Sequence, residues 1–140
     1  MRDPVFNTIP KIMKTQTEKQ IIGNRGEDIA CEYLTKNGYR IVGRNFRVQG
    51  GELDIIARHN DELIFFEVKT RGPRAFGYPE EAVTIHKMKR ITRAIKYYLC
   101  KTPIKNTYIR FDIISVELQN NLPDYKVNHL KNIELKENFV

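Results

Sequence analysis

The region from Glu18 to Asn37 repeats hydrophobic and small residues at steps of three and four, which is the period of an amphipathic helix. The repeated positions, which we expect to face a core, are Ile22, Gly26, Ile29, Ala30, Tyr33 and Leu34. Residues 1–17 contain two prolines and little periodicity. The pattern therefore predicts a flexible N-terminal extension at 1–17, followed by a single domain at 18–140 that opens with a helix.

Three strands are predicted after this helix. Tyr39–Val48 and Glu52–His59 are rich in β-branched and aromatic residues and are separated by a turn at Gly50-Gly51. Glu62–Thr70 carries a nearly continuous apolar run, which is typical of a central strand that is covered on both faces. The three strands would form a meander, with Asn60-Asp61 as the second turn.

The second half of the chain is predicted to contain a helix and two strands. Arg71–Pro79 is expected to be a loop, and a helix is expected from Pro79 to Lys101 that could be broken near Thr84. Further strands are predicted at Tyr108–Leu118 and Tyr125–Leu130. The order α-β-β-β-α-β-β indicates an α/β protein in which helices flank a mixed β-sheet.

The chain is basic, because 24 lysines and arginines outnumber 17 aspartates and glutamates and give a formal net charge of +7. Such a charge favours a polyanionic partner, which could be nucleic acid, an anionic membrane or an acidic protein. No apolar run reaches the roughly 18 residues that span a bilayer, and residues 1–17 lack the hydrophobic centre of a signal peptide. We therefore expect a cytoplasmic protein without a membrane partner, in which Cys31 and Cys100 are buried free thiols.

Polar residues on the second and third predicted strands form a candidate site. Glu67 and Lys69 are two residues apart, so their side chains share one face of the strand while Val68 points to the other. If Asn60-Asp61 is a two-residue hairpin loop, Asp54 lies directly opposite Glu67 on the neighbouring strand. The sequence thus predicts two carboxylates and an ammonium side by side.

Two opposed carboxylates destabilise a sheet unless a positive charge compensates. Asp54 and Glu67 are therefore candidate ligands for Mg²⁺ or Mn²⁺, with the Val68 carbonyl as a further ligand. Lys69 would supply an ammonium that favours hydroxide and the charge that develops on phosphate. Glu27 borders the buried stripe of the first helix and could bind a second ion or orient water, or could simply be a helix-terminal charge or the partner of an arginine.

The spacing of Asp54 from Glu67-Val68-Lys69 resembles the D-(E)-x-K core of restriction-endonuclease-like nucleases, the PD-(D/E)xK superfamily. Four segments between Ile21 and Val116 are also similar to the uncharacterised bacterial YraN-like family, which is related to Holliday-junction resolvases. These segments are GNRGE from Gly23, GELD from Gly51, FEVKTR from Phe66 and RFD from Arg110. The resemblance implies an α-β-β-β-α-β core and the nuclease roles just described.

Basic and aromatic residues that follow the motif are candidates for contact with nucleic acid, although they could equally serve as loop anchors or solvated charges. These candidates are Arg71, Arg74, Phe76, Lys87, Lys89, Arg90 and Arg93. Glu52 could support the site or simply pair with Lys69. Asp112 is expected to form a structural ion pair with Arg110 and to lie outside the site.

The motif and the resemblance together predict an endonuclease that uses Mg²⁺ or Mn²⁺ to hydrolyse DNA, with branched, flapped or single-stranded DNA as candidate substrates. The alternatives are a non-catalytic nucleic-acid-binding module that acts with a partner, and an RNA-directed nuclease, since no base-reading motif is visible. DNA is favoured over RNA. A symmetric cut in two strands would need a homodimer, whereas a monomer would suit nicking.

Overall fold

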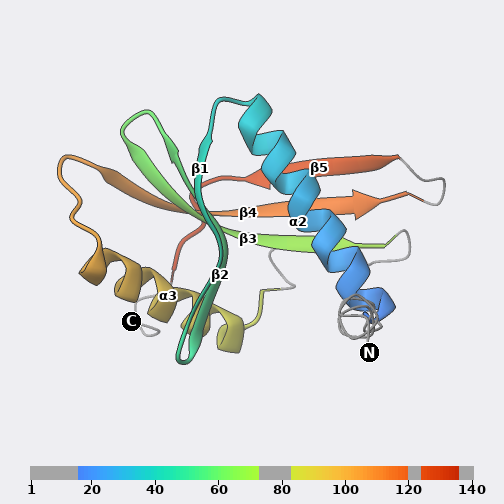
Figure 1. Cartoon of the computed structure of the whole chain (residues 1–140), viewed down its shortest axis with the longest axis horizontal. Helices are drawn as coiled ribbons and strands as arrows, with labels where there is room; N and C mark the ends of the chain where they lie inside the picture. Colours follow the sequence, from blue (N-terminus) through green and yellow to red (C-terminus); the bar gives the residue numbers. More distant parts are fainter. Residues whose placement is uncertain (1–15, 73–82, 120–123, 136–140) are drawn as a thin grey trace, which may run out of the picture.

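The computed structural model describes residues 16–72, 83–119 and 124–135. The elements, in chain order, are α2 (Glu18–Lys36), β1 (Arg40–Val48), β2 (Gly51–His59), β3 (Glu62–Arg71), α3 (Ile85–Lys101), β4 (Tyr108–Leu118) and β5 (Tyr125–Leu130). The strands form one mixed sheet in the order β1-β2-β3-β4-β5, in which β3 and β4 are parallel and the other neighbours are antiparallel (Figure 1). The predicted element order and the restriction-endonuclease-like α/β class are confirmed. Residues 1–15, Arg74, Phe76 and the helical turn expected at Pro79 lie outside the described residues.

Polar side chains fix where the two helices begin. The Thr17 side chain accepts a hydrogen bond from the Gln20 amide at 3.1 Å, and the Gln20 side chain accepts one from the Thr17 amide at 2.9 Å, which is a capping box. The Thr84 hydroxyl accepts a hydrogen bond from the Lys87 amide at 3.2 Å and caps α3 in the same way. The break expected near Thr84 is therefore the start of α3.

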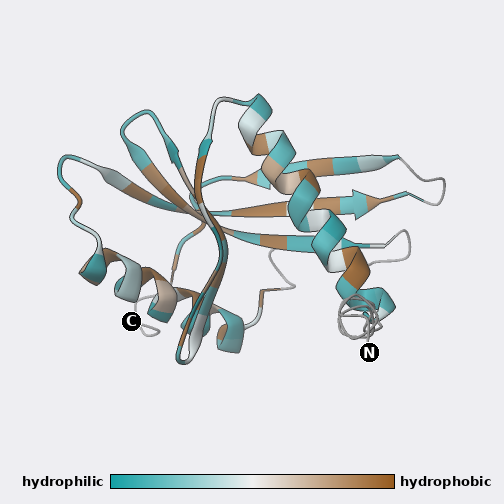
Figure 2. Ribbon diagram, viewed as in Figure 1, coloured by the Kyte–Doolittle hydropathy of each residue, from teal (hydrophilic) through white to brown (hydrophobic). Residues whose placement is uncertain are grey.

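Helices α2 and α3 cover opposite faces of the sheet and create two separate cores. The core beneath α2 contains, among others, Ile29, Ala30, Leu34, Ile55, Ile64, Phe66, Val68 and Ile114. The core beneath α3 contains, among others, Leu53, Ile56, Leu63, Phe65, Ile91, Ala94, Ile95 and Ile113. Figure 2 shows hydrophobic residues along the middle of the sheet and polar residues toward the strand ends. Successive residues of β3 point alternately into the two cores. Both faces of the strand are therefore buried, which explains why its run of apolar residues is nearly continuous.

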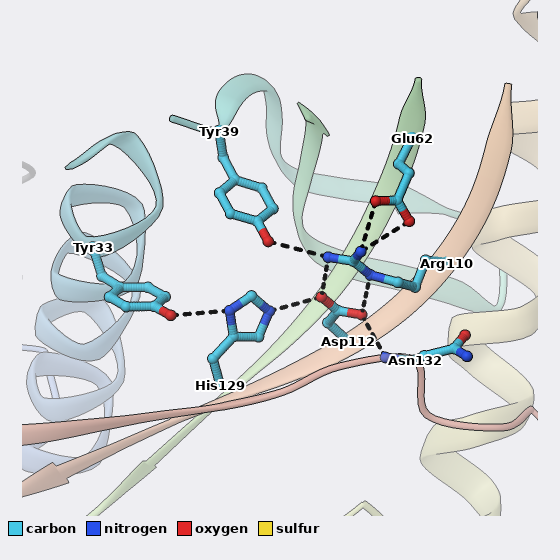
Figure 3. A network of polar contacts seen from close by, with 7 residues as sticks. All are labelled: Tyr33, Tyr39, Glu62, Arg110, Asp112, His129 and Asn132. Carbon is cyan, nitrogen blue, oxygen red and sulfur yellow. Dashed lines mark hydrogen bonds and ion pairs between the residues drawn. The ribbon is translucent and has the colours of Figure 1, made fainter. Parts of the chain in front are cut away.

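A buried ion-pair network joins the starts of β3 and β4 to β5 (Figure 3). Asp112 is fully buried and accepts hydrogen bonds from Arg110 at 2.9 Å, from the Asn132 amide at 2.8 Å, and from His129 Nε2, which lies 2.7 Å away. Arg110 also donates two hydrogen bonds to Glu62, at 2.8 and 2.9 Å. Buried charges are tolerated when they are paired in this way, so the structural role expected for Asp112 is confirmed.

Both cysteines are free, with Cys31 partly buried and Cys100 exposed. The expectation of burial is wrong for Cys100, because it lies near the end of α3 and off the helical face that carries Ile91 and Ile95 into the core. No helix among the described residues is long and apolar enough to cross a bilayer.

Candidate active site

The β2–β3 hairpin has the register that a two-residue loop requires. The pairing runs from His59 opposite Glu62 to Ile55 opposite Phe66, and Asn60 adopts a positive φ of 55° in the turn. The ladder ends there, one step before Asp54 would face Glu67. The predicted register is confirmed, but these two carboxylates lie just beyond the last backbone pair.

The ladder ends because β2 leaves β3 and turns toward α3 (Figure 1). At Gly51 a Cβ atom would lie 2.9 Å from the backbone nitrogen of Ala94 and 2.9 Å from the carbonyl oxygen of Arg90, so only glycine allows this approach. Asp54 stands where the strands separate, and its Oδ2 accepts a hydrogen bond from the Val68 amide at 2.8 Å. The side chain thereby satisfies a backbone donor that β2 no longer reaches.

Glu67 is the most deeply buried carboxylate of the candidate site, with 4% of its surface exposed. Its Oε2 has no hydrogen-bond partner among the described residues. Burial, and then the charge of Asp54, raise the pKa of Glu67 to about 9, although Lys87 opposes the shift. A buried carboxylate oxygen without a partner is costly, so this position favours a cation that would neutralise it.

Glu27 is brought beside these carboxylates by a close contact between α2 and β3. A Cβ atom at Gly26 would lie 2.8 Å from the Thr70 Cβ and closer still to the Thr70 hydroxyl, so the contact requires glycine. Glu27 and Asp54 line the same cleft, and burial followed by the charge of Asp54 raises the pKa of Glu27. Glycine at position 26 therefore sets how near the Glu27 carboxylate comes to the sheet.

Two lysines reach the site from different elements. Lys69 of β3 lines the cleft, and its side chain makes no hydrogen bond or ion pair within the described parts of the chain. Lys87 of α3 forms a close ion pair with Glu52, and its Nζ lies 3.5 Å from Glu67 Oε1. Burial alone would lower the pKa of Lys87, but the hydrogen bond to Glu52 and the nearby carboxylates outweigh it and raise the pKa.

Glu52 therefore meets Lys87, and the pairing with Lys69 that the register suggested is wrong. The reason is that β2 has already left β3 at this point and has carried Glu52 toward α3. The hydrogen bond from Lys87 holds the pKa of Glu52 below its usual value, and Arg90 lies 3.9 Å from the same carboxylate. Sequence periodicity gave no sign of this arrangement, because it depends on where α3 crosses the departing hairpin.

These residues open onto a cleft of about 980 Å³ that runs along the first half of α2. It is lined by Gln16, Glu18, Lys19, Gln20, Ile22, Gly23, Asn24, Glu27, Asn45, Arg47, Asp54, Glu67, Val68, Lys69, Thr70, Gly72 and Lys87. Lys19 and Arg47 were not singled out in the sequence, where each is an isolated charge among many.

Other residues predicted to contact nucleic acid lie elsewhere. Lys89, Arg90 and Arg93 do not line the cleft; Arg90 is near Glu52, and the Arg93 side chain packs against Gly50. Arg71 forms the last residue of β3. Of the basic residues of α3 that were predicted to contact nucleic acid, only Lys87 thus lines the cleft.

The donor set fits a divalent ion only in part. Within residues 16–72, 83–119 and 124–135, no three histidine, cysteine, aspartate or glutamate side chains lie close enough together to hold a metal ion. Asp54 and the unpartnered oxygen of Glu67 are suitable ligands, and hard ions such as Mg²⁺ complete their coordination with water and phosphate oxygens. The two carboxylates therefore fit an ion that is bound together with a phosphate.

Comparison with known proteins identifies the family. Residues 26–116 match the model of "Uncharacterised protein family UPF0102". The chain is 45% identical over 112 residues to a UPF0102 protein of Persephonella marina, covering 80% of this chain and 91% of the relative. It is 41% identical over 114 residues to one of Caldicellulosiruptor saccharolyticus, covering 81% and 97%. It is 42% identical over 118 residues to one of Caldanaerobacter subterraneus subsp. tengcongensis, covering 84% and 97%. The chain therefore belongs to the uncharacterised family UPF0102, the YraN-like family of the restriction-endonuclease-like superfamily.

Proposed function

We propose that this protein is a Mg²⁺- or Mn²⁺-dependent endonuclease that hydrolyses phosphodiester bonds of DNA. The observation that carries the proposal is the buried Glu67 carboxylate, whose Oε2 is unpartnered beside Asp54 in a cleft that also contains Lys69 and Lys87. Two carboxylates and two ammonium groups in one cleft suit the binding of a cation and a phosphate together.

Each residue has a distinct task in this proposal. Asp54, Glu67 and the Val68 carbonyl would hold the ion, and Glu27 would orient water or bind a second ion. The chemistry that a bound divalent ion supplies is polarisation of the scissile phosphate and a lower pKa for a bound water. The side chain of Lys69, which has no partner among the described residues, is available to favour hydroxide and to stabilise the developing charge.

We infer that an unpaired strand is the preferred substrate. A cleft of about 980 Å³ has room for a short stretch of one strand beside the carboxylates. Lys19 and Arg47 lie in the lining and could track its phosphates. Single-stranded, flapped or branched DNA, in which a strand can leave the duplex, is therefore the preferred substrate class.

A cleavage screen tests the proposal. Purified protein is incubated with duplex, single-stranded, flap, four-way-junction and RNA substrates in Mg²⁺, Mn²⁺ or EDTA. The parent should cut at least one DNA substrate only with metal. Lys69→Met and Asp54→Asn should lower the rate by about 10²–10³, the loss typical when a group that stabilises developing charge is removed. Asn keeps an oxygen for the Val68 amide, so Asp54→Asn tests the charge and spares the fold.

The matched control is Lys126→Met, since Lys126 is an exposed lysine of β5 outside the cleft. It should cut at the parent rate. If Lys69→Met cuts as fast as Lys126→Met, the activity does not arise from this site.

A binding module without catalysis is the second candidate. Its support is that no three metal-binding side chains converge in the described residues and that Lys87 already lies 3.5 Å from Glu67 Oε1. This candidate requires nucleic-acid binding that survives EDTA and Asp54→Asn, with no cleavage of any substrate in the screen. Cleavage of RNA alone would instead identify an RNA-directed nuclease.

A further inference from the structure

Lys87 stands apart from the strand motif, yet it contacts two carboxylates of the site. It lies in the first turn of α3, and its backbone is fixed there by the hydrogen bond from its amide to Thr84. Its side chain, 27% exposed, reaches Glu52 and Glu67 at once. An ammonium held this way is part of the site's charge balance and not a solvated helix charge.

Resting on the proposed function, we infer that Lys87 is a further active-site lysine that shares Glu67 with the divalent ion, and that Glu52 positions it. In the absence of the ion, Lys87 pairs with Glu52 and also contacts Glu67 Oε1. With an ion on Glu67, Lys87 would remain paired with Glu52 and would be available to a phosphate in the cleft.

The two carboxylate oxygens of Glu67 differ in their contacts, which supports one oxygen for Lys87 and the other for the ion. Lys87 lies 3.5 Å from Oε1, whereas Oε2 is buried and has no partner among the described residues. The contact to Glu67 is the longer of the two that Lys87 makes, and Glu52 is its close partner. The weaker contact is the one that a competing cation can break at least cost.

Lys87 and the divalent ion would compete for Glu67, because both are positively charged. An ammonium and a divalent ion on the same carboxylate repel each other, and this repulsion is strong where water is largely excluded. A divalent ion is repelled twice as strongly as a proton by the same ammonium. Removing Lys87 should therefore favour the divalent ion even if Glu67 also binds protons more tightly.

Lys87 and Lys69 would then both be available to a phosphate in the cleft. Lys69 comes from β3, and Lys87 comes from α3, the helix that packs against Gly51 of the departing hairpin. Loss of Lys87 should consequently weaken catalysis while it strengthens ion binding. These opposite signs separate the inference from a structural role, in which both properties would fall together.

The test measures Mn²⁺ affinity by titration and cleavage rate by single turnover, on the full chain. Lys87→Met should bind Mn²⁺ about tenfold more tightly, as expected for removal of one adjacent charge. It should cut about 10²-fold more slowly, with Lys87→Arg restoring part of the rate. Lys101→Met, at the exposed far end of α3, is the matched control and should change neither quantity.

Glu52→Gln tests the positioning role. Without its anchor, Lys87 should rest on Glu67, and Mn²⁺ binding should weaken several-fold. This weakening should disappear when Glu52→Gln is combined with Lys87→Met, because the effect passes through the lysine. If it persists in the double variant, Glu52 acts through its own charge and the positioning role is wrong.

Thermal melting in EDTA shows whether each variant folds, and only folded variants are compared. Suppose that the parent cuts DNA but that Lys87→Met has the same Mn²⁺ affinity and the same cleavage rate as Lys101→Met. That result overturns this inference and leaves the proposed function standing. The same conclusion follows if Lys87→Met loses both Mn²⁺ affinity and cleavage rate. A parent that neither binds Mn²⁺ nor cuts overturns the proposed function as well.

Discussion

Glu67 occupies a position that works against its own charge. It lies on the central strand of the sheet with 4% of its surface exposed, and burial and Asp54 together raise its pKa to about 9 from an ordinary 4.5. Between these values the folded protein holds a proton that the unfolded chain releases. The free energy of unfolding should therefore fall as pH rises from about 4.5 through about 9.

This residue gives a prediction for the metal-free protein. Urea denaturation in EDTA at pH 5 to 8.5 should show parent stability declining with pH, and Glu67→Gln, which cannot ionise, should decline less steeply. Mn²⁺ should stabilise the parent more at the alkaline end, because the ion replaces the proton. Parallel pH curves for parent and variant would mean that Glu67 does not carry the proton.

At this scale the sequence predicts part of the site and misses the rest. Strand alternation places Glu67 and Lys69 on one face, and the hairpin loop length brings Asp54 to the same place. The pairing of Glu52 with Lys87 could not be predicted, because it depends on the path of a helix and a bent hairpin that are distant in sequence.

Between elements, the contact of α2 with β3 depends on one glycine. A Cβ atom at Gly26 would collide with Thr70, whereas one at Gly23, a turn earlier on the same helix, would have no atom within 4 Å. Gly23 is therefore a suitable control for a substitution at Gly26.

Gly26→Ala should destabilise the protein by about 1–3 kcal/mol, the usual cost of overpacking. Gly23→Ala should be neutral or stabilise it by up to about 1 kcal/mol, because alanine favours the helix. Thermal and urea denaturation measure both. Equal effects would show that α2 adjusts freely and that Gly26 does not fix the position of Glu27.

The order of the elements could be predicted because hydrophobic periodicity and turn residues are local signals. The end of the β2–β3 ladder could not, since it follows from Gly51 packing on the backbone of α3. The same separation of β2 from β3 places Asp54 at the point where the two strands part, so that its carboxylate lines the cleft.

Over the whole molecule, a net charge of +7 predicts salt-dependent binding to a polyanion but does not say where. The cleft gives a location, since Lys19 of α2 and Arg47 of β1 line it with the two site lysines. The sequence could not reveal this grouping, because the two residues come from different layers.

Lys19→Gln and Arg47→Gln should each weaken binding of single-stranded DNA and lower the slope of log affinity against log salt by about 0.7, the value for one lost phosphate contact on a single strand. Fluorescence anisotropy at several salt concentrations in EDTA measures both, with Lys126→Gln as control. If Lys89→Gln and Arg93→Gln reduce the slope and the cleft variants do not, the strand follows α3 instead.

The edges of the sheet restrict how two copies could associate. In the described sheet, β1 carries a register shift between Ile41 and Gly43 and exposes Arg40, Arg44 and Arg47, while β5, at the other edge, is only six residues long. Irregular, charged or short edge strands disfavour hydrogen bonding to another sheet. Growth of the sheet from one molecule into the next is therefore discouraged. A pair of molecules that cut both strands of a duplex would have to meet through helices or loops, which would leave each cleft free to receive its own strand.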